Sequence, residues 1–278
     1  RRQPPDTRRG SPGSAVGGEK GVRLSSAYIE RLLDDPNSGV VEPAGMILEV
    51  VQGEGGVIPA AVSWLQEIRR ITAQRGIPLI IDEVQTGLGR TGRLFAFEHA
   101  GIVPDVVVLS KAVGGGLPLS VVVYRPEWDR WTAGAHAGTF RGNQLAMATG
   151  QATMEFIVAE RIDEHAARMG ERLFGLLRRI QAESRSIGDV RGRGLMLGVE
   201  IVDRDEPTDF PGCHPCAPGL ASAIQHEALR RGLILELGGR HNSVVRFLPP
   251  LIVTAEQIDT IATIFADAVR AAEQQHEA

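Results

Sequence analysis

Four short apolar runs, separated by turn residues and one amphipathic segment, constrain the fold most strongly. They occupy residues 44–51, 78–81, 105–109 and 119–124. Because almost every side chain in these runs is apolar, the strands that they predict are buried on both faces, as in a parallel sheet covered by helices. Between the first two runs, apolar residues recur at helical spacing up to Gly76, a typical helix stop. The pattern predicts an α/β fold with a largely parallel sheet.

The C-terminal half follows a different pattern. Residues 144–184 contain few helix breakers and predict a long helix, interrupted near residues 161–163. Thr254 and Gln257 have the spacing of a capping box at the start of the last helix. These features are typical of a smaller α+β domain. The other predicted elements are a strand at 194–202, a helix at 219–231, and short strands at 233–235 and 244–247.

The predicted elements divide the chain into three parts. Residues 1–21 are rich in Arg, Pro and Gly, so we expect them to be irregular or disordered, with a short helix following at residues 25–33. Residues 22–155 are expected to form the C-terminal part of a large domain built on the parallel or mixed sheet. Residues 156–278 are expected to form a linking helix and the small α+β domain.

The composition excludes several classes of protein. A hydrophobic content of 43% supports a buried core, while a net charge of −4 without a basic stripe argues against nucleic-acid binding. No run of about 18 apolar residues predicts a membrane span, and no apolar segment follows the charged N-terminus as in a secretory signal. Cys213 and Cys216 are too few for a disulfide framework. We therefore expect a cytoplasmic metabolic protein.

Polar residues follow three of the predicted strands. Glu54 comes shortly after the first, Asp82 and Gln85 after the second, and Lys111 after the third. Ligands of open α/β sheets bind at the carboxyl ends of the strands. A partly desolvated lysine can attack an aldehyde as a free amine, and the glycines at 114–116 would let a flat ligand approach closely. An aspartate could keep a pyridine nitrogen protonated.

Each of these residues also has a simpler interpretation. A single lysine after a strand is usually a solvated strand end, and a single aspartate there is usually a turn or helix cap. Taken one at a time, the simpler interpretation is the better one. The ordered combination of Asp82, Gln85 and Lys111 at neighbouring strand ends favours a ligand site.

Three motifs resemble the class III (ω-amino acid) aminotransferases of the pyridoxal 5'-phosphate (PLP) fold type I. They are LIIDEVQTGLGRTG at residues 79–92, DVVVLSKAVGGGLP at 105–118 and HAGTFRGN at 136–143. With LEVVQGEGG at 48–56, the third motif is most similar to that of diaminobutyrate–2-oxoglutarate aminotransferases. The resemblance begins near Gly18 and implies the PLP-dependent transferase fold, PLP as cofactor and a homodimer.

The resemblance implies a role for each matching residue. Lys111 would hold the cofactor as a Schiff base and later transfer a proton. Asp82 would pair with the pyridine nitrogen, and Gln85 would lie near the ring hydroxyl. Thr139 would bind the cofactor phosphate of the neighbouring subunit.

Two further matches concern the substrate. Arg246 matches the arginine that binds a substrate carboxylate, and Glu54 matches the glutamate that can pair with it, so that one site accepts two substrates. The implied reaction moves the terminal amino group of 2,4-diaminobutyrate to 2-oxoglutarate, giving glutamate and L-aspartate 4-semialdehyde, or runs in reverse. An ornithine or 4-aminobutyrate type of ω-amine aminotransferase is the alternative. For Arg246 alone, a surface salt bridge is the commoner explanation.

The start of the chain departs from the family pattern. The resemblance implies a phosphate-binding turn and a ring-stacking aromatic residue ahead of the position of Gly18, and the sequence has neither there. We therefore expect an N-terminally truncated chain, and an inactive fragment is the non-enzymatic alternative.

Two other motifs carry weaker signals. Residues 87–92 match GxGxxG, but they do not directly follow a strand, so we interpret them as a loop near the cofactor and reject a dinucleotide site. The CxxC of Cys213 and Cys216 lacks two further ligands at zinc spacing, so we expect no metal site. A redox role of the pair stays open, although incidental thiols in a surface loop are the better explanation.

Overall fold

The computed structural model describes residues 18–207 and 214–277. Within these residues, the N-terminal part is built on a sheet of four strands in the order β1-β4-β5-β6. The first three are parallel and β6 is antiparallel to β5, so the sheet is mixed. The predicted α/β fold is therefore confirmed, with one antiparallel strand at an edge. The strands are β1 (Met46–Glu49), β4 (Leu79–Asp82), β5 (Val106–Leu109) and β6 (Val121–Tyr124).

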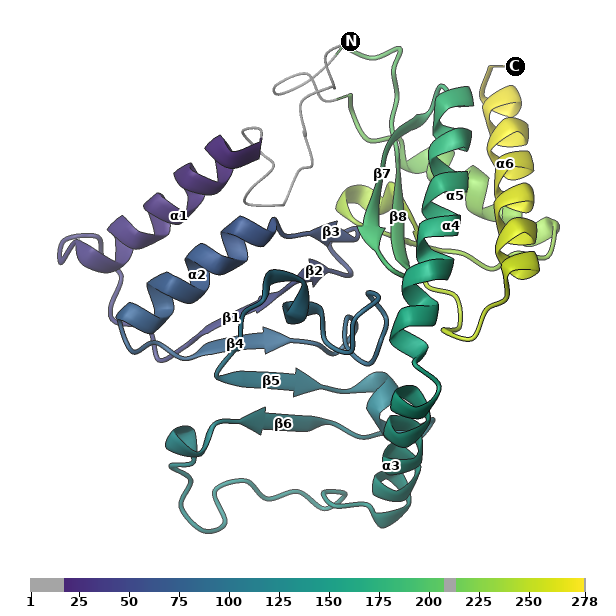
Figure 1. Ribbon diagram of the computed structural model, residues 1–278. Helices are drawn as coiled ribbons and strands as arrows, with labels where there is room; N and C mark the ends of the chain where they lie inside the picture. The colour runs from purple at the N-terminus through teal and green to yellow at the C-terminus, as the bar shows by residue number, and fades with distance from the viewer. Residues whose placement is uncertain (1–17, 208–213, 278) are drawn as a thin grey trace.

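Helices α1 (Gly18–Asp34) and α2 (Val62–Gln74) lie side by side along this sheet (Figure 1). The apolar stripe of α2 is buried against the sheet, because its leucine and isoleucines recur at helical spacing. Helix α1 begins seven residues before the predicted Ser25, so the expectation that residues 18–21 are irregular is wrong. The expectation for residues 1–17 concerns a part of the chain outside the described residues.

Short elements connect the strands of this sheet. Two of them, β2 (Val51–Gln52) and β3 (Ile58–Pro59), pair with each other across the turn that contains Glu54. The 3-10 helices are η1 (Ala96–Ala100), η2 (Lys111–Gly114) and η3 (Pro126–Trp128).

Helices α3 (Gln144–Ala159) and α4 (Ile162–Glu183) replace the single long helix, with the predicted interruption between them. Arg161 has a positive φ of 49°, which a continuing helix does not allow. Asn143 caps the start of α3, and its side-chain oxygen accepts hydrogen bonds from two backbone N–H groups of the first turn.

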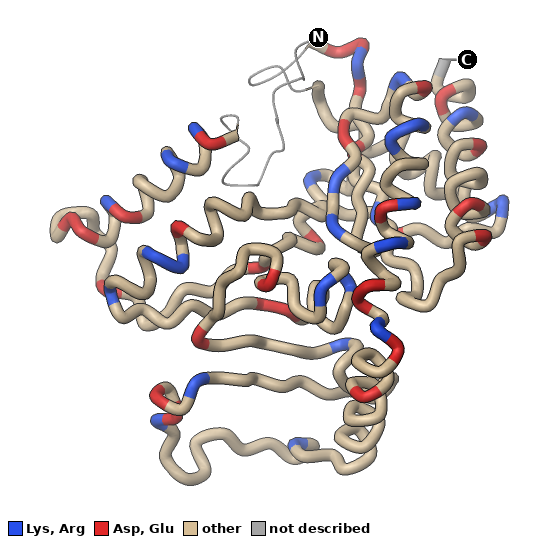
Figure 2. Tube along the Cα trace, viewed as in Figure 1, with Lys and Arg blue, Asp and Glu red and all other residues tan. Residues whose placement is uncertain are grey.

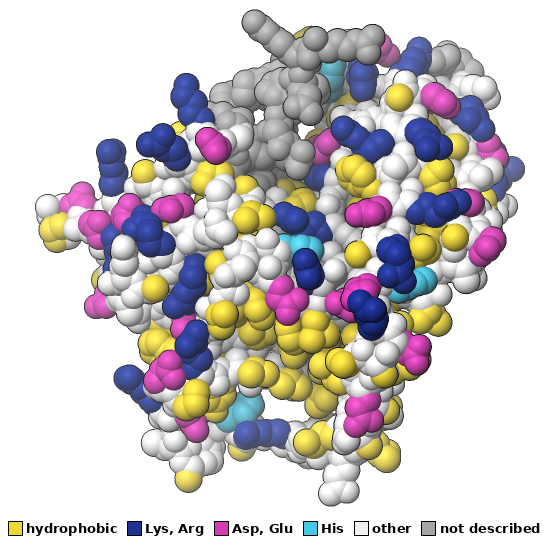
Figure 3. All heavy atoms as spheres, viewed as in Figure 1, with side chains coloured by type: hydrophobic (Ala, Val, Ile, Leu, Met, Phe, Trp, Pro, Cys, Tyr) yellow, Lys and Arg dark blue, Asp and Glu magenta, His cyan; other side chains and the backbone are white. Residues whose placement is uncertain are grey.

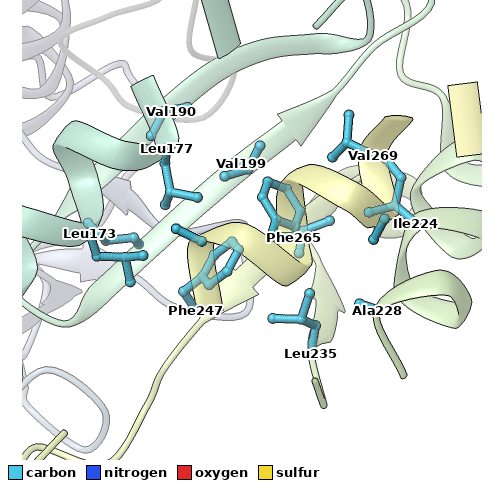
Figure 4. Packing of buried hydrophobic residues seen from close by; sticks show 14 of the residues in the cluster. Leu173, Leu177, Val190, Val199, Ile224, Ala228, Leu235, Phe247, Phe265 and Val269 are labelled. Atoms are coloured by element: carbon cyan, nitrogen blue, oxygen red, sulfur yellow. The ribbon is translucent and has the colours of Figure 1, made fainter. Parts of the chain in front are cut away.

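A second sheet, with the order β7-β8-β10-β9, forms the C-terminal part and is antiparallel throughout. Helices α4, α5 and α6 pack on it around a core that includes Leu177, Phe247 and Phe265 (Figure 4). The predicted capping box is confirmed, because Thr254 N donates to Gln257 Oε1 at 2.9 Å and Gln257 N donates to Thr254 Oγ1 at 3.3 Å. The elements are β7 (Ile187–Arg193), β8 (Met196–Ile201), α5 (Pro218–Arg230), β9 (Glu236–Gly238), η5 (Arg240–Asn242), β10 (Val244–Phe247) and α6 (Ala255–Glu277).

Two details of this sheet differ from the prediction. Strand β7 was not predicted, since its sequence has two glycines and three charged residues among its seven positions. Strand β9 begins at Glu236, so the predicted strand at 233–235 is wrong and the strand lies three residues further along the chain.

The surface carries both charge signs. Basic and acidic residues are mixed along several of the helices, and neither sign forms a continuous stripe in this view (Figure 2). Hydrophobic side chains gather in the middle of the visible face, between α2 and the lower end of α4 (Figure 3). No helix among residues 18–207 and 214–277 is long and apolar enough to cross a membrane.

Candidate active site

Lys111 lies just beyond the carboxyl end of β5, at the first position of η2. Its φ of 51° is in the left-handed region, which is costly for a residue with a side chain and is seen mostly where the surroundings enforce it. Lys20 and Lys111 are the two lysines of the whole chain. An amine in a strained backbone position at a strand end is therefore a specific feature of this site.

Two of the three glycines after Lys111 are required by close packing. A Cβ at Gly115 would lie 2.6 Å from Thr149 O, and one at Gly114 would lie 3.1 Å from Leu119 Cβ. Thr149 Oγ1 also donates to Gly114 O at 2.7 Å. These glycines let η2 pack closely on α3 and thereby fix the backbone that carries Lys111. Only Gly116 has open space around its Cβ position.

Asp82 ends β4, the neighbour of β5 in the sheet. Because the two strands are parallel and Asp82 is in register with Val108, the carboxylate and Lys111 leave the sheet at the same edge. The Oδ1 atom of Asp82 accepts a hydrogen bond from Val84 N at 2.9 Å, which leaves Oδ2 for a second donor. Asp82 is therefore a partly buried acceptor beside the lysine.

Gln85 links the charged groups of the site. In one orientation of its amide, Nε2 donates to Glu54 Oε1 at 3.4 Å. In the other, the oxygen accepts from Lys111 Nζ at 3.1 Å and from Arg246 Nη2 at 3.2 Å. We assign the second orientation, because it gives two charge-assisted bonds at shorter distances. In this orientation, a Cβ at Gly53 would lie 1.9 Å from the nitrogen of the Gln85 amide, so Gly53 leaves the space that this amide fills.

Arg246 comes from the second sheet, on β10, and reaches the first sheet's edge. Its side chain is 2% exposed, and Nη1 donates to Glu54 Oε2 at 2.7 Å. This bond with Arg246 lowers the pKa of the Glu54 carboxyl, although burial acts in the opposite direction. Glu236, on the neighbouring strand β9, places Oε2 3.6 Å from Arg246 Nη2. The sequence predicted Glu54 and Arg246 but missed Glu236, because it placed the preceding strand too early.

Thr139 lies elsewhere. It belongs to the exposed segment between η3 and α3, which extends beyond β6, away from the second sheet (Figure 1). The structure thus brings together Lys111, Gln85, Glu54 and Arg246, with Asp82 at the same sheet edge, and it keeps Thr139 apart from them within one chain.

The GxGxxG segment is a packing loop between the two sheets. A Cβ at Gly89 would lie 3.3 Å from the backbone of Asp163, and one at Gly92 would lie 3.2 Å from Ala167 Cα, so these glycines let the loop contact α4. Arg90 Nη1 donates to Leu195 O at 3.0 Å and to Pro249 O at 2.6 Å. Burial lowers the pKa of Arg90 to about 10.

The described cysteine adds nothing to this site. Cys216 is a partly buried free thiol whose backbone pairs with Val202. Cys213 lies outside the described residues, so the interpretation of the CxxC stays a prediction.

The arranged side chains fit a cofactor with an aldehyde and a pyridine ring. Lys111 supplies the amine, and the partly buried Asp82 supplies an acceptor for a ring nitrogen at the same edge. Gln85 supplies an amide that can bond either to the amine or to a ring oxygen. Arg246 supplies a buried guanidinium for a substrate carboxylate. A lysine amine and an acidic partner for the pyridine nitrogen are the groups by which proteins commonly hold PLP.

Comparisons with known proteins agree with this geometry. The family model described as "Aminotransferase class-III" matches residues 19–269. A diaminobutyrate–2-oxoglutarate aminotransferase of Rhizobium meliloti is 57% identical over 252 residues, covering 91% of this chain and 54% of the relative. One of Haemophilus influenzae is 47% identical over 254 residues, covering 91% of this chain and 56% of the relative. The chain spans about half the length of the curated relatives it matches.

Solved structures of the same kind of protein superpose on the chain. An ornithine aminotransferase of Toxoplasma gondii, with partial occupancy of PLP at its active site, has a TM-score of 0.79 at 30% identity, covering 91% of this chain and 55% of the other. A transaminase from the marine bacterium Virgibacillus also has a TM-score of 0.79, at 29% identity, covering 92% and 58%. The predicted PLP-dependent transferase fold and the predicted family are both confirmed: the chain belongs to the class III aminotransferases.

Proposed function

We propose that the protein is a PLP-dependent aminotransferase that acts on the terminal amino group of 2,4-diaminobutyrate. The acceptor is 2-oxoglutarate, and the products are glutamate and L-aspartate 4-semialdehyde; the reverse reaction uses the same site. The observation that carries the proposal is the contact between Lys111 and Gln85 beside Asp82, in a chain of this family. The diaminobutyrate aminotransferases of Rhizobium meliloti and Haemophilus influenzae support the choice of substrate.

When bound, PLP supplies an electron-withdrawing ring that acidifies the carbon next to the substrate nitrogen. Lys111 holds the cofactor through its amine and, once released by substrate, moves a proton at that carbon. The Asp82 carboxylate keeps the ring nitrogen protonated, and Gln85 orients the ring by hydrogen bonding. Asp82 and Gln85 are partly buried, whereas Lys111 reaches solvent in the single chain.

Arg246 and Glu54 let one site take two substrates in turn. With Glu54 on Nη1, the guanidinium is neutralised, which suits a donor whose reacting end is an amine. When a dicarboxylate enters, its carboxylate binds the guanidinium, and Glu54 is then free to turn to solvent, where most of its side chain already lies. Opening the pair does not leave the buried guanidinium without an anion, because the carboxylate of the substrate becomes its partner.

The assembly is a homodimer in this proposal, and its compartment is the cytoplasm. Thr139 of one chain binds the cofactor phosphate held by the other chain. Support comes from its position in an exposed segment apart from Lys111. A site of this kind is complete only in the dimer.

A second donor remains a candidate. The solved relatives include ornithine aminotransferases at 30% identity, so ornithine is the alternative amine, followed by 4-aminobutyrate. Initial rates with 2,4-diaminobutyrate, ornithine and 4-aminobutyrate at equal concentration decide between them. A higher kcat/KM for ornithine would replace the diaminobutyrate assignment.

Titration of the purified protein with PLP tests the chemistry. We expect a visible absorption band from the bound cofactor, and reduction with borohydride should fix it on Lys111, located by peptide mass spectrometry. Lys111→Ala should lose both, while Lys20→Ala should keep both, because Lys20 is the chain's other lysine and is exposed on α1. Equal labelling of wild type and Lys111→Ala would contradict the proposal, and absence of any band would favour an inactive fragment.

A further inference from the structure

Glu236 is set opposite Arg246 by the register of the second sheet. Strands β9 and β10 are antiparallel, and Arg246 and Glu236 are direct partners across them. Side chains of directly opposed residues lie on the same face of a sheet, about 5 Å apart at Cβ. On the other side, the partner of Arg246 is Gly198 of β8, which has no side chain. The arginine therefore has one cross-strand neighbour that can bind it.

The three nitrogens of the guanidinium have different partners. Nη1 donates to Glu54 at 2.7 Å, and Nη2 lies 3.2 Å from the Gln85 oxygen and 3.6 Å from Glu236 Oε2. Nε is buried and has no partner among the described residues. In a guanidinium, Nε–H and one Nη2–H point the same way and form the edge that binds a carboxylate with two bonds. Glu54 is not on that edge, whereas Glu236 lies at one end of it.

The two acids also differ in how freely they can leave. Glu236 is 68% exposed and its contact is longer than a hydrogen bond, so it is held mainly by charge. Glu54 has a true hydrogen bond at 2.7 Å, and its backbone is fixed by Gly239 N, which donates to Glu54 O at 2.9 Å. Glu236, the more weakly bound of the two acids, therefore lies at the edge of the Arg246 guanidinium where Nε has no partner among the described residues.

We propose that Glu236 is a specificity-determining residue that competes with an incoming carboxylate for the Nε and Nη2 edge of Arg246. This inference rests on the proposed function, since it assigns the control of carboxylate affinity at that same site. Glu236 repels a dicarboxylate at the mouth of the site and attracts the ammonium of a diamino acid. Removing its charge must therefore shift the two substrate classes in opposite directions.

Binding of glutarate, an unreactive dicarboxylate, measures this competition without requiring turnover. Calorimetry on the whole chain should give a Kd about two- to five-fold lower for Glu236→Gln than for wild type, the range set by a partly exposed charge pair. Glu236→Asp should retain the wild-type value within twofold, because the charge is kept. Glu183→Gln is the matched control: it removes the same charge from an exposed position at the end of α4 and should change nothing.

Steady-state kinetics give a second readout. In Glu236→Gln, KM for 2-oxoglutarate should fall and KM for the diamino acid should rise, with kcat changed less than twofold. A purely structural role for Glu236 would move both constants the same way.

The outcomes separate this inference from the proposed function. Equal glutarate affinity in Glu236→Gln and wild type, or equal effects of Glu236→Gln and Glu236→Asp, overturns the role of Glu236 while transamination stands. If wild type shows neither the cofactor band nor turnover, but glutarate still binds more tightly to Glu236→Gln than to wild type, the proposed function is overturned. The competition at Arg246 then stands. Absence of glutarate binding in every chain overturns both.

Discussion

At the scale of single residues, burial and charge separate the groups of the site from one another. Lys111, Glu54 and Glu236 reach solvent, while Arg246 is buried and Asp82 is partly buried. The buried cation attracts anions to a fixed point, and the exposed acids can move to make way for them. A mobile acid against a fixed arginine is what an exchange of substrates at one site needs.

Gly53 makes room for the amide that connects Lys111 with Arg246. In Gly53→Ala, the new Cβ would occupy the position of the Gln85 amide nitrogen in the assigned orientation, and the flexible end of Gln85 must move. We expect the free energy of unfolding to change by no more than about 1 kcal/mol, because no backbone atom is displaced. Affinity for PLP, followed by the visible band, should fall up to about tenfold through lost charge-assisted bonds.

The double variant Gly53→Ala/Gln85→Ala shows whether the effect passes through Gln85. If it does, the double variant has the same PLP affinity as Gln85→Ala alone, since the two changes remove one interaction. Additive losses would mean that Gly53 acts by another route.

Glu83, beside Asp82, is a buried carboxyl that the proposed chemistry does not use. It is 1% exposed, and burial raises its pKa above the usual 4.5, although hydrogen bonds from Thr86 and Phe97 act against this. A raised pKa in the folded state means that this group stabilises the fold fully below pH 4.5 and loses that contribution as pH rises through the folded value. Glu83→Gln should therefore flatten the fall in stability above pH 4.5.

Urea denaturation at a series of pH values measures this change. The expected result is a stability at pH 8 equal to or above wild type, since an amide keeps an acceptor for Phe97 N without a buried charge. Glu183→Gln, at an exposed position, should follow the wild-type curve. A parallel pH dependence in Glu83→Gln and wild type would show that Glu83 does not titrate in this range.

At the scale of helices and strands, close backbone contacts decide which elements meet. Gly170 on α4 faces the turn between β7 and β8, and a Cβ there would lie 2.2 Å from Gly194 O. Gly175, on the same helix, has no described atom within 4 Å of its Cβ position. The close contact with Gly194 therefore requires a glycine at position 170, whereas no contact requires one at position 175.

Alanine at these two positions should have opposite effects. Gly170→Ala forces α4 away from the turn, and we expect a loss of about 1–3 kcal/mol in the free energy of unfolding. Gly175→Ala should gain about 0.5–1 kcal/mol, because alanine is the better helix former. Thermal and urea unfolding of both variants check the signs, and a stable Gly170→Ala protein would contradict the close contact.

The sequence predicted the elements with clear periodicity and missed those defined by tertiary contacts. The apolar strands β4 and β5 and the capped helix α6 were predicted because their local patterns agree with their burial. Strand β7 has no such pattern: Gly188 and Gly192 are required by the approach of Val202 and of the Met196 backbone, which only the folded sheet reveals. Glu236 was missed for the same reason, since its pairing with Arg246 follows from strand register.

The candidate site was predictable to a similar extent. Lys111, Asp82 and Gln85 end neighbouring parallel strands, so topology brings them to one edge, and Arg246 and Glu54 entered through the resemblance. The purpose of the glycines after Lys111 was not predictable, because it depends on the packing of η2 against α3. Local sequence patterns thus predict the sheet edge at which the site lies, whereas the packing around Lys111 depends on contacts between elements that the sequence does not reveal.

At the scale of the whole molecule, the proposed site joins two sheets. We propose that residues 22–155 belong to a large domain and residues 156–278 to a linking helix and small domain. The separate clusters of buried residues on the two sheets support this division. Arg246, on the second sheet, then contacts Gln85 across the boundary, and Gln85 also accepts a hydrogen bond from Lys111.

The proposed dimer makes a prediction about mixtures of inactive chains. Lys111→Ala and Thr139→Ala should each abolish or strongly reduce turnover, because the first removes the amine and the second the phosphate contact. If Thr139 serves the neighbouring chain, a mixed dimer contains one site with both residues intact and one with neither. Mixing the two variants, with a brief exposure to mild denaturant to exchange chains, should therefore restore activity, with at most one working site per mixed dimer. If Lys111 and Thr139 served the same chain, every site in the mixture would still lack one of them, and activity would stay at the level of the separate variants.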